Sequence, residues 1–224
     1  MATGLALVLS STAATAGPEE ARCPGPPDIS VRARAAADAQ AACDGARRAI
    51  DFLVAAGLEP PPELTIDIVE QLPGELRGLA VGCYVRDTRR IVLLSYDAFE
   101  ATGSWLRSPV DRELYRSAAS HEMAHAVVGC NAASPELPVP AHEYVAYVAM
   151  FATMEPAVRQ RVLARFGGTG FDSTLQINTV VYLVDPLQFA VDAWRHYLKR
   201  RDRAAWLRDV VAGHVVQVFP TEGP

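Results

Sequence analysis

Five consecutive residues in the middle of the chain, His121-Glu122-Met123-Ala124-His125, have types and a spacing that suit metal-assisted hydrolysis. Residues four apart on an α-helix lie on the same face, so His121 and His125 can reach one metal ion. Glu122 lies beside the first histidine and can accept a proton from water at that metal. This HExxH pattern therefore predicts a zinc site with two imidazole ligands and a carboxylate that acts as general base.

The segment that carries this pattern is expected to form a helix over residues 109–128, called the metal helix below. Ser108 suits the capping position and Pro109 the first helical position, whereas Gly129 and Asn131 are expected to mark the end. Apolar residues fill the second half, so its polar residues need partners, because burying unpaired polar groups is costly. A metal ion would be such a partner, and the alternative is an ordinary helix without metal.

A catalytic zinc ion normally has three protein ligands and one position for water. Extended HExxHxxGxxH sites need a glycine and a histidine where this chain has Val128 and Asn131, so that class is disfavoured. Other sites take a glutamate from a following helix, and Glu143 lies in the first turn of a helix expected after the proline-rich run 137–140. Glu143 is therefore the expected third ligand. The rivals that stay open are His142, Asp192, His196 and His214.

The chain resembles the gluzincins, which are thermolysin-like zinc metallopeptidases, through four residues: His121, Glu122, His125 and Glu143. The spacing from the second histidine to the glutamate is close to the one that this group uses. The EYVAY stretch that starts at the glutamate is also similar to that of small secreted bacterial proteins with HExxH sites. The resemblance implies a zincin-like fold, one zinc ion and hydrolysis of a peptide bond. It departs at Tyr147, because gluzincins often have an aspartate near there that orients a metal-binding histidine.

The implied reaction assigns a role to Glu122, which takes a proton from the attacking water and later passes it to the leaving amine, without a covalent intermediate. The tetrahedral oxyanion needs a donor besides the metal, and the resembling family uses a histidine or tyrosine from a later segment. Candidates for transition-state or substrate contacts are Tyr182, His196, Tyr197 and His142.

A β-hairpin is expected just before the metal helix, with strands over 78–85 and 90–95 around a turn at 86–89. In zincin folds a sheet edge in this position lines the cleft, where an extended peptide can add as a further strand. The alternative is a hairpin of the core without a binding role.

The 224-residue chain is long enough for a sizeable core, and half of its residues are hydrophobic. The net charge of −5 and the lack of a basic patch argue against nucleic-acid binding. Residues 1–16 resemble a signal peptide, since an apolar run precedes Ala14-Thr15-Ala16. No membrane anchor is expected, because no later run suits a span and Cys23 lacks a lipoprotein context. A periplasmic or secreted location follows.

The four cysteines form an even set, as expected in an oxidising compartment: Cys23, Cys43, Cys83 and Cys130. None forms a CxxC pair, which disfavours a structural zinc knuckle or a thioredoxin-type site. We expect Cys23 to pair with Cys43, joining the N-terminal arm to the first helix. We expect Cys83 to pair with Cys130, joining the hairpin to the end of the metal helix. Free buried thiols are the alternative.

The order of elements predicts an α+β fold of the zincin type, with a small N-terminal sheet and its hairpin packed on the metal helix and a helical C-terminal lobe. Residues 17–224 are expected to form one domain with lobes over about 29–137 and 138–214. The remaining predictions are a proline-rich arm over 18–28, a helix over 30–56 and a strand over 64–69. Further helices are expected over 97–101, 156–165, 186–200 and 203–212, and residues 174–183 could form either a strand or a helix.

These observations favour an exported zinc-dependent metallopeptidase whose partner is a peptide or protein substrate. The alternative is a catalytically inactive protein of zincin fold that binds a metal or a partner. The oligomeric state is left open.

Overall fold

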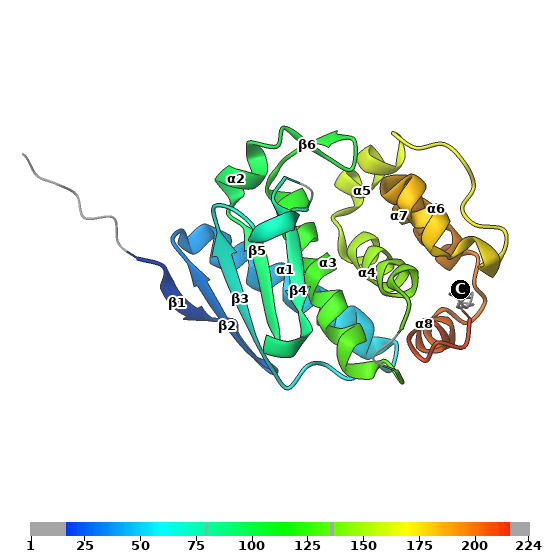
Figure 1. The fold of residues 1–224 in the computed structure, drawn as a ribbon, viewed down its shortest axis with the longest axis horizontal. Helices are drawn as coiled ribbons and strands as arrows, with labels where there is room; N and C mark the ends of the chain where they lie inside the picture. The colour runs from blue at the N-terminus through cyan, green and yellow to red at the C-terminus, as the bar shows by residue number, and fades with distance from the viewer. Residues whose placement is uncertain (1–16, 79, 135–136, 216–224) are drawn as a thin grey trace, which may run out of the picture.

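A computed structural model describes residues 17–78, 80–134 and 137–215. Figure 1 shows a sheet on one side of the molecule, two long helices packed on it, and a group of helices from the second half of the chain beyond them. The α+β class that the sequence predicts is therefore confirmed. The expected signal peptide lies outside the described residues.

One mixed sheet has the strand order β1-β2-β3-β5-β4. Its strands are β1 (Glu19–Arg22), β2 (Asp28–Ala33), β3 (Glu63–Val69), β4 (Gly82–Val85) and β5 (Arg90–Leu94). The three inner strands β2, β3 and β5 are parallel to one another, whereas β1 and β4 are antiparallel to their neighbours. The predicted strand with Leu64, Ile66 and Ile68 on one face is β3, and all three side chains are buried. The predicted hairpin consists of β4 and β5, so β4 is the edge strand.

The helices of the described residues are α1 (Ala36–Ala55), α2 (Tyr96–Glu100), α3 (Arg112–Asn131), α4 (Val139–Thr153), α5 (Pro156–Leu163), α6 (Thr179–Val184), α7 (Pro186–Leu198) and α8 (Arg203–Val211). Short 3-10 turns lie at Gly74–Leu76, Arg86–Thr88 and Thr174–Gln176, and a small ribbon consists of β6 (Ser104–Trp105) and β7 (Ser108–Pro109). The undecided segment 174–183 is therefore helical. None of the described helices has both the length and the apolar character needed to cross a bilayer.

Helices α1 and α3 cross at very short distance because Gly45 has no side chain. A methyl group on Gly45 would lie 2.3 Å from the carbonyl oxygen of Arg116 and 2.9 Å from Cβ of Ala119. The hydroxyl of Ser120 donates a hydrogen bond of 2.8 Å to the carbonyl oxygen of Gly45. This contact fixes α3, the metal helix, against α1 one residue before the HExxH pattern begins.

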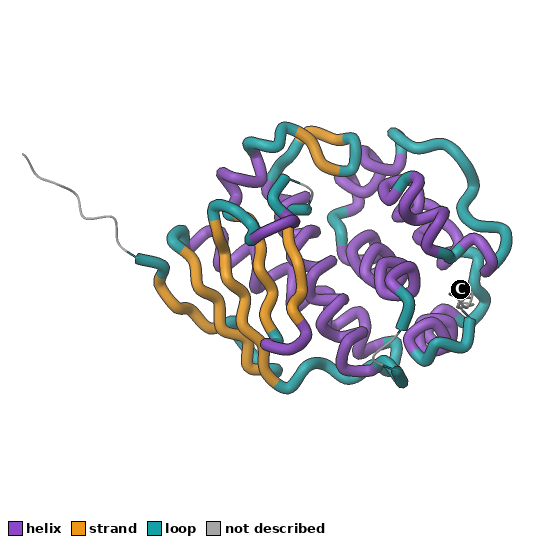
Figure 2. Tube along the Cα trace, viewed as in Figure 1, coloured by secondary structure: helices purple, strands orange, loops and turns teal. Residues whose placement is uncertain are grey.

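Helix α4 is the central element of the second half, and it lies between α3 and α7 (Figure 2). Its residues from Tyr144 to Phe151 are all buried, as expected for a helix that is apolar on every side. The chain therefore positions the segment with Glu143 beside the metal helix.

The metal helix begins three residues later than predicted. Ser108 and Pro109 belong to β7, and Asp111 caps the helix by accepting a 2.9 Å hydrogen bond from the backbone N–H of Leu114. A residue in a strand ladder cannot also have the backbone geometry of the first helical turn, so the cap moves to the next suitable side chain.

The metal helix also continues past Gly129 and ends at Asn131. The Asn131 amide donates to the carbonyl oxygens of Val127 and Glu59 at 2.8 and 2.7 Å, and its oxygen accepts from the N–H of Glu59 at 2.8 Å. This side chain satisfies backbone groups at the helix end, which removes the need for a glycine there.

The helix predicted over 30–56 is too long, because residues 28–33 form β2 and part of the proline-rich arm forms β1. Ile29, Val31 and Ala33 are buried, whereas Arg32 between them is exposed. This period-two alternation is the pattern of a half-buried strand, and pairing with β3 stabilises it.

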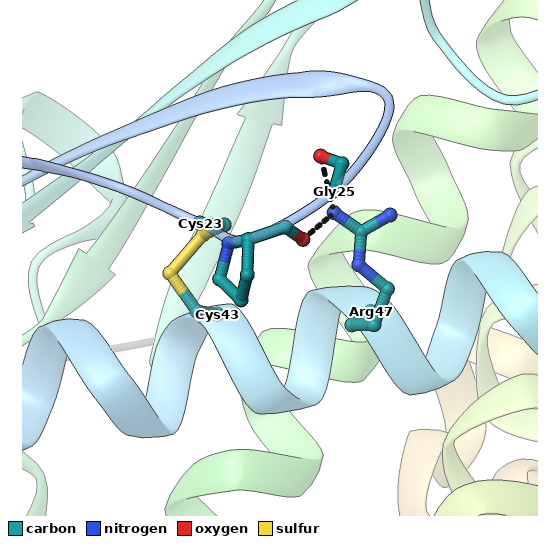
Figure 3. The surroundings of a disulfide bond; sticks show 5 residues. Cys23, Gly25, Cys43 and Arg47 are labelled. Atoms are coloured by element: carbon teal, nitrogen blue, oxygen red, sulfur yellow. Dashed lines mark hydrogen bonds between the residues drawn. A yellow bond between two sulfur atoms is a disulfide. The ribbon is translucent and has the colours of Figure 1, made fainter.

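One of the two expected disulfides is present, between Cys23 and Cys43. Figure 3 shows that it attaches the N-terminal arm to α1, beside Arg47. The Arg47 guanidinium donates to the carbonyl oxygens of Pro24 at 2.6 Å and Gly25 at 3.0 Å. The disulfide and these hydrogen bonds together fix the turn that precedes β2.

The second expected disulfide is wrong, because Cys83 and Cys130 are free thiols. The register pairs Cys83 with Val92 and Tyr84 with Ile91. Tyr84 faces α3, since a methyl group on Gly129 would lie 3.2 Å from its ring. Successive strand residues point to opposite faces, so Cys83 points away from the helix that carries Cys130.

Candidate metal centre

Three side chains from α3 and α4 converge on one point. The Nε2 atoms of His121 and His125 lie 3.1 Å apart. The carboxylate of Glu143 lies 3.6 Å from each of them, with Oε2 toward His121 and Oε1 toward His125. All three potential ligand atoms lie within 4.8 Å of one another, so the group could hold a metal ion.

The protonation states of these side chains suit a cation. Burial lowers the pKa of His121 to about 3 and that of His125 well below its usual value, so both imidazoles are neutral and offer lone pairs. Burial also raises the pKa of Glu143 to about 7, and its Oε2 has no hydrogen-bond partner among the described residues. A buried carboxylate oxygen beside two neutral imidazoles is the donor set of a divalent metal site.

Glu122 lies on the same stretch of α3 and is 5% exposed. Burial, followed by repulsion from Glu143, raises its pKa to about 8. Its side chain faces Gly82 at the start of edge strand β4. A buried carboxylate beside a potential metal site is suited to exchange a proton with water.

Two tyrosines lie against this group. The Tyr182 hydroxyl, on α6, faces the carboxylate of Glu143 and partly offsets the rise that burial causes in its pKa. The ring of Tyr147, on α4, packs against the ring of His121 with centroids 4.6 Å apart. The sequence suggests Tyr182 as a transition-state contact, whereas Tyr147 stands out there only as a departure from the gluzincin pattern. The available signal was its spacing, since Tyr147 lies four residues after Glu143 and thus on the same helical face.

The candidate ligands lie in an open cleft with a volume of about 1010 Å³. One wall is the edge strand β4 with the segment before it, and the opposite wall includes residues of α4 and α6. Apolar side chains from separate segments, such as Leu72, Trp105 and Leu187, also line the cleft. Its volume is far larger than a metal ion needs, so the cleft has room for an organic ligand beside the three candidate metal ligands.

The structure places His142 in the same cleft, with its ring centroid 6.1 Å from that of His125. Burial and the nearby charge of Arg86 lower its pKa to about 4. It lies beside the three converging side chains, but its ring is not one of them.

The other candidates for a third ligand lie elsewhere. Asp192 accepts a 3.1 Å hydrogen bond from Gln188 on its own helix, and His214 lies 3.7 Å from Asp209 on the surface. His196 belongs to a buried cluster behind α4.

In that cluster the ring of His196 is hydrogen-bonded outside the lining of the cleft. The Arg200 guanidinium donates to Nε2 of His196, so the proton of the neutral ring is on Nδ1, which lies 2.7 Å from the Tyr144 hydroxyl. The same hydroxyl accepts a 3.0 Å hydrogen bond from Nε1 of Trp206. Tyr197 is likewise outside the cleft, with its ring stacked on Trp194.

Comparison with known proteins gives one family match. Residues 29–219 match the model of DUF6639, a family of unknown function. The chain matches no curated protein and no solved structure.

Proposed function

We propose that this chain, which belongs to the DUF6639 family, is an exported zinc-dependent metallopeptidase of zincin-like fold. The observation that carries the proposal is the convergence of His121, His125 and Glu143, with their facing atoms 3.1 to 3.6 Å apart, beside the buried carboxylate of Glu122. Two neutral imidazoles and one carboxylate leave a tetrahedral ion one open position, which is the coordination of catalytic rather than structural zinc.

Zinc bound there would lower the pKa of water and polarise a carbonyl group. Glu122 accepts the proton of the attacking water and returns it to the leaving nitrogen. Burial raises its pKa and a zinc ion bound beside it would lower that pKa, so the two effects bring the group toward the neutral range in which it can gain and lose a proton. The hydroxyl of Tyr182 lies beside Glu143, and in that position it can donate a hydrogen bond to the developing oxyanion.

The edge strand β4 supports a polypeptide as substrate. It pairs with β5 on one side, and within the described part of the chain no further strand lies beside it, so main-chain N–H and C=O groups face the cleft side. An extended peptide can pair with such an edge, as in other β-addition complexes. Gly82, at the start of β4, is adjacent to Glu122, which brings a peptide bound along this strand close to the base.

Export is supported by the apolar segment before Gly17 and by the Cys23–Cys43 disulfide, because structural disulfides persist in oxidising compartments. The zincin-like fold is supported by a histidine-bearing helix packed beside an antiparallel edge strand, with a glutamate from the following helix.

The decisive experiment compares purified wild-type protein with Glu122→Gln, Glu143→Ala and the surface control His214→Ala. We expect one zinc per chain in the wild type, Glu122→Gln and His214→Ala, and a large loss of zinc in Glu143→Ala. Cleavage in a peptide library should fall at least about 100-fold in Glu122→Gln and stay unchanged in His214→Ala. Wild-type protein that binds zinc but cleaves no peptide, or a Glu122→Gln variant that cleaves normally, would contradict the peptidase proposal and leave a metal-binding protein.

A further inference from the structure

The ring of His121 has an unusual environment for a metal ligand. Its Nε2 atom faces His125 and Glu143, so Nδ1 is the ring nitrogen that could hydrogen-bond with the surrounding protein. This Nδ1 atom is buried and has no hydrogen-bond partner among the described residues. Metal-binding histidines normally donate this second N–H to a carboxylate, carbonyl or water, which fixes the orientation of the ring. Within the described residues, the orientation of His121 therefore depends on a packing contact.

Tyr147 makes that contact. Its ring lies 4.6 Å from the His121 ring between centroids, with an interplanar angle of 48°, and the residue is only 7% exposed. Tyr147 is on α4, four residues after Glu143. The helix that carries the third candidate ligand therefore also carries the ring that packs against His121. A rotation of the imidazole about its Cβ–Cγ bond would push it into the tyrosine ring.

We propose that Tyr147 is the positioning residue for His121, and that its aromatic ring takes the place of the missing hydrogen-bond partner. The proposal rests on the metal site within the proposed function and does not depend on peptide hydrolysis. It also accounts for the residue type at a position where the gluzincins often have an aspartate. An aspartate would fix the imidazole by a directed hydrogen bond, whereas a tyrosine fixes it by packing.

The ring and the hydroxyl of Tyr147 have different surroundings. Tyr147 lines the cleft, and burial, followed by the nearby Glu143, Tyr182 and Glu122, raises the pKa of its hydroxyl. Phenylalanine keeps the ring and removes the hydroxyl, whereas leucine removes the ring and keeps an apolar side chain. The two substitutions therefore separate packing against His121 from any contact made by the hydroxyl.

The test measures zinc affinity by competition with a chelator for wild type, Tyr147→Phe and Tyr147→Leu. We expect Tyr147→Phe to bind zinc within about threefold of wild type, which is a small free-energy difference. Tyr147→Leu should bind about 10- to 100-fold more weakly, the usual effect of losing a residue that orients a ligand. The visible spectrum of the cobalt-substituted protein should be unchanged in the Phe variant and altered in the Leu variant.

Tyr144→Leu is the matched control, because Tyr144 is a buried tyrosine on the same helix that contacts His196 instead of a metal ligand. It should lower thermal stability without lowering zinc affinity comparably. If Tyr147→Leu does not fold, Tyr147→Met, whose longer unbranched side chain adapts to irregular space, takes its place. Equal zinc affinity in wild type and the variant without the ring would overturn the proposal, as would an equal loss in Tyr147→Phe. Wild-type protein that binds no metal would instead refute the metal site itself.

Discussion

Gly82 and Glu122 face each other so closely that the glycine leaves no room for a side chain. A methyl group on Gly82 would lie 2.8 Å from Cγ and 3.0 Å from Oε1 of Glu122. The glycine begins the edge strand β4, and the glutamate follows the first histidine of the HExxH pattern. The position of the carboxylate therefore depends on a residue that sequence reasoning assigned only to a hairpin.

Gly82→Ala should therefore impair the base without removing the metal ligands. The added methyl group displaces the Glu122 side chain, because a Cβ atom cannot lie 2.8 Å from another carbon. We expect peptide hydrolysis to fall about 10- to 100-fold, since small displacements of a catalytic group have effects of this size. Zinc content, measured by elemental analysis, should be unchanged. Gly167→Ala is the control, because a methyl group at Gly167 meets no atom within 4 Å, and hydrolysis at the wild-type rate in Gly82→Ala would contradict the assignment of Glu122 as base.

Gly45→Ala tests the crossing of α1 and α3. The new methyl group would lie 2.3 Å from the carbonyl oxygen of Arg116, which belongs to the backbone of a helix and cannot move by itself. We expect the helices to separate and the free energy of unfolding to fall by about 3 kcal/mol, toward the upper end of overpacking effects. Urea denaturation measures this change. An unchanged midpoint would show that the crossing is wider than described.

The pH dependence of stability should contain a contribution from His196. Burial and the charges of Arg200 and Lys199 lower its pKa from 6.5 to about 4 in the folded protein. Because the folded pKa lies below the unfolded one, the unfolded state binds the proton more readily between these values. The contribution of neutral His196 to the free energy of unfolding is fully present above about pH 6.5. It is lost as the pH falls toward 4, which lowers the free energy of unfolding by up to about 3 kcal/mol. Protonation also places an N–H on Nε2, where Arg200 already donates.

The test measures the unfolding free energies of the metal-free wild type and of His196→Gln over about pH 4 to 7.5. Because the other buried histidines are present in both proteins, the difference between the two isolates the contribution of His196. The difference between the two proteins should shrink as the pH falls. A difference that stays constant with pH would contradict the assignment.

The Cys23–Cys43 disulfide should stabilise the N-terminal strands. It closes a loop with a sequence separation of 20, for which loop-closure entropy predicts about 3 kcal/mol. We expect the double substitution Cys23→Ser and Cys43→Ser to lower the free energy of unfolding by about this amount. The matched control replaces the free thiols Cys83 and Cys130 by serine. Thiol titration in denaturant should count two free thiols in the wild type. A count of zero would show that Cys83 and Cys130 form a disulfide after all.

The sequence allowed the metal helix, the hairpin, the first disulfide and the convergence of Glu143 with two histidines to be anticipated. These features depend on local spacing: i and i+4 on a helix, alternation in a strand, and a helix start after prolines. The missed features depend on pairing between distant segments. Ser108 fits a helix cap until the ribbon with Trp105 is known, and residues 30–33 fit a helix until β3 lies beside them.

The same limit explains the errors about side-chain partners. Cys83 lies in the hairpin and Cys130 at the end of the metal helix that packs against it, but the register of β4 points Cys83 away from that helix. His196 has a suitable residue type for an oxyanion donor, whereas its hydrogen bonds with Tyr144 and Arg200 depend on the packing of α4, α7 and α8. No spacing rule within a single segment contains that information.

Helix α4 carries Glu143 and Tyr147 toward the cleft and Tyr144 toward the cluster of His196 and Trp206. The contacts that anchor α4 among the C-terminal helices are therefore separate from those that it makes with the candidate metal ligands. Substitutions at Trp206 are accordingly expected to lower thermal stability and to leave zinc affinity close to that of the wild type, as for Tyr144→Leu.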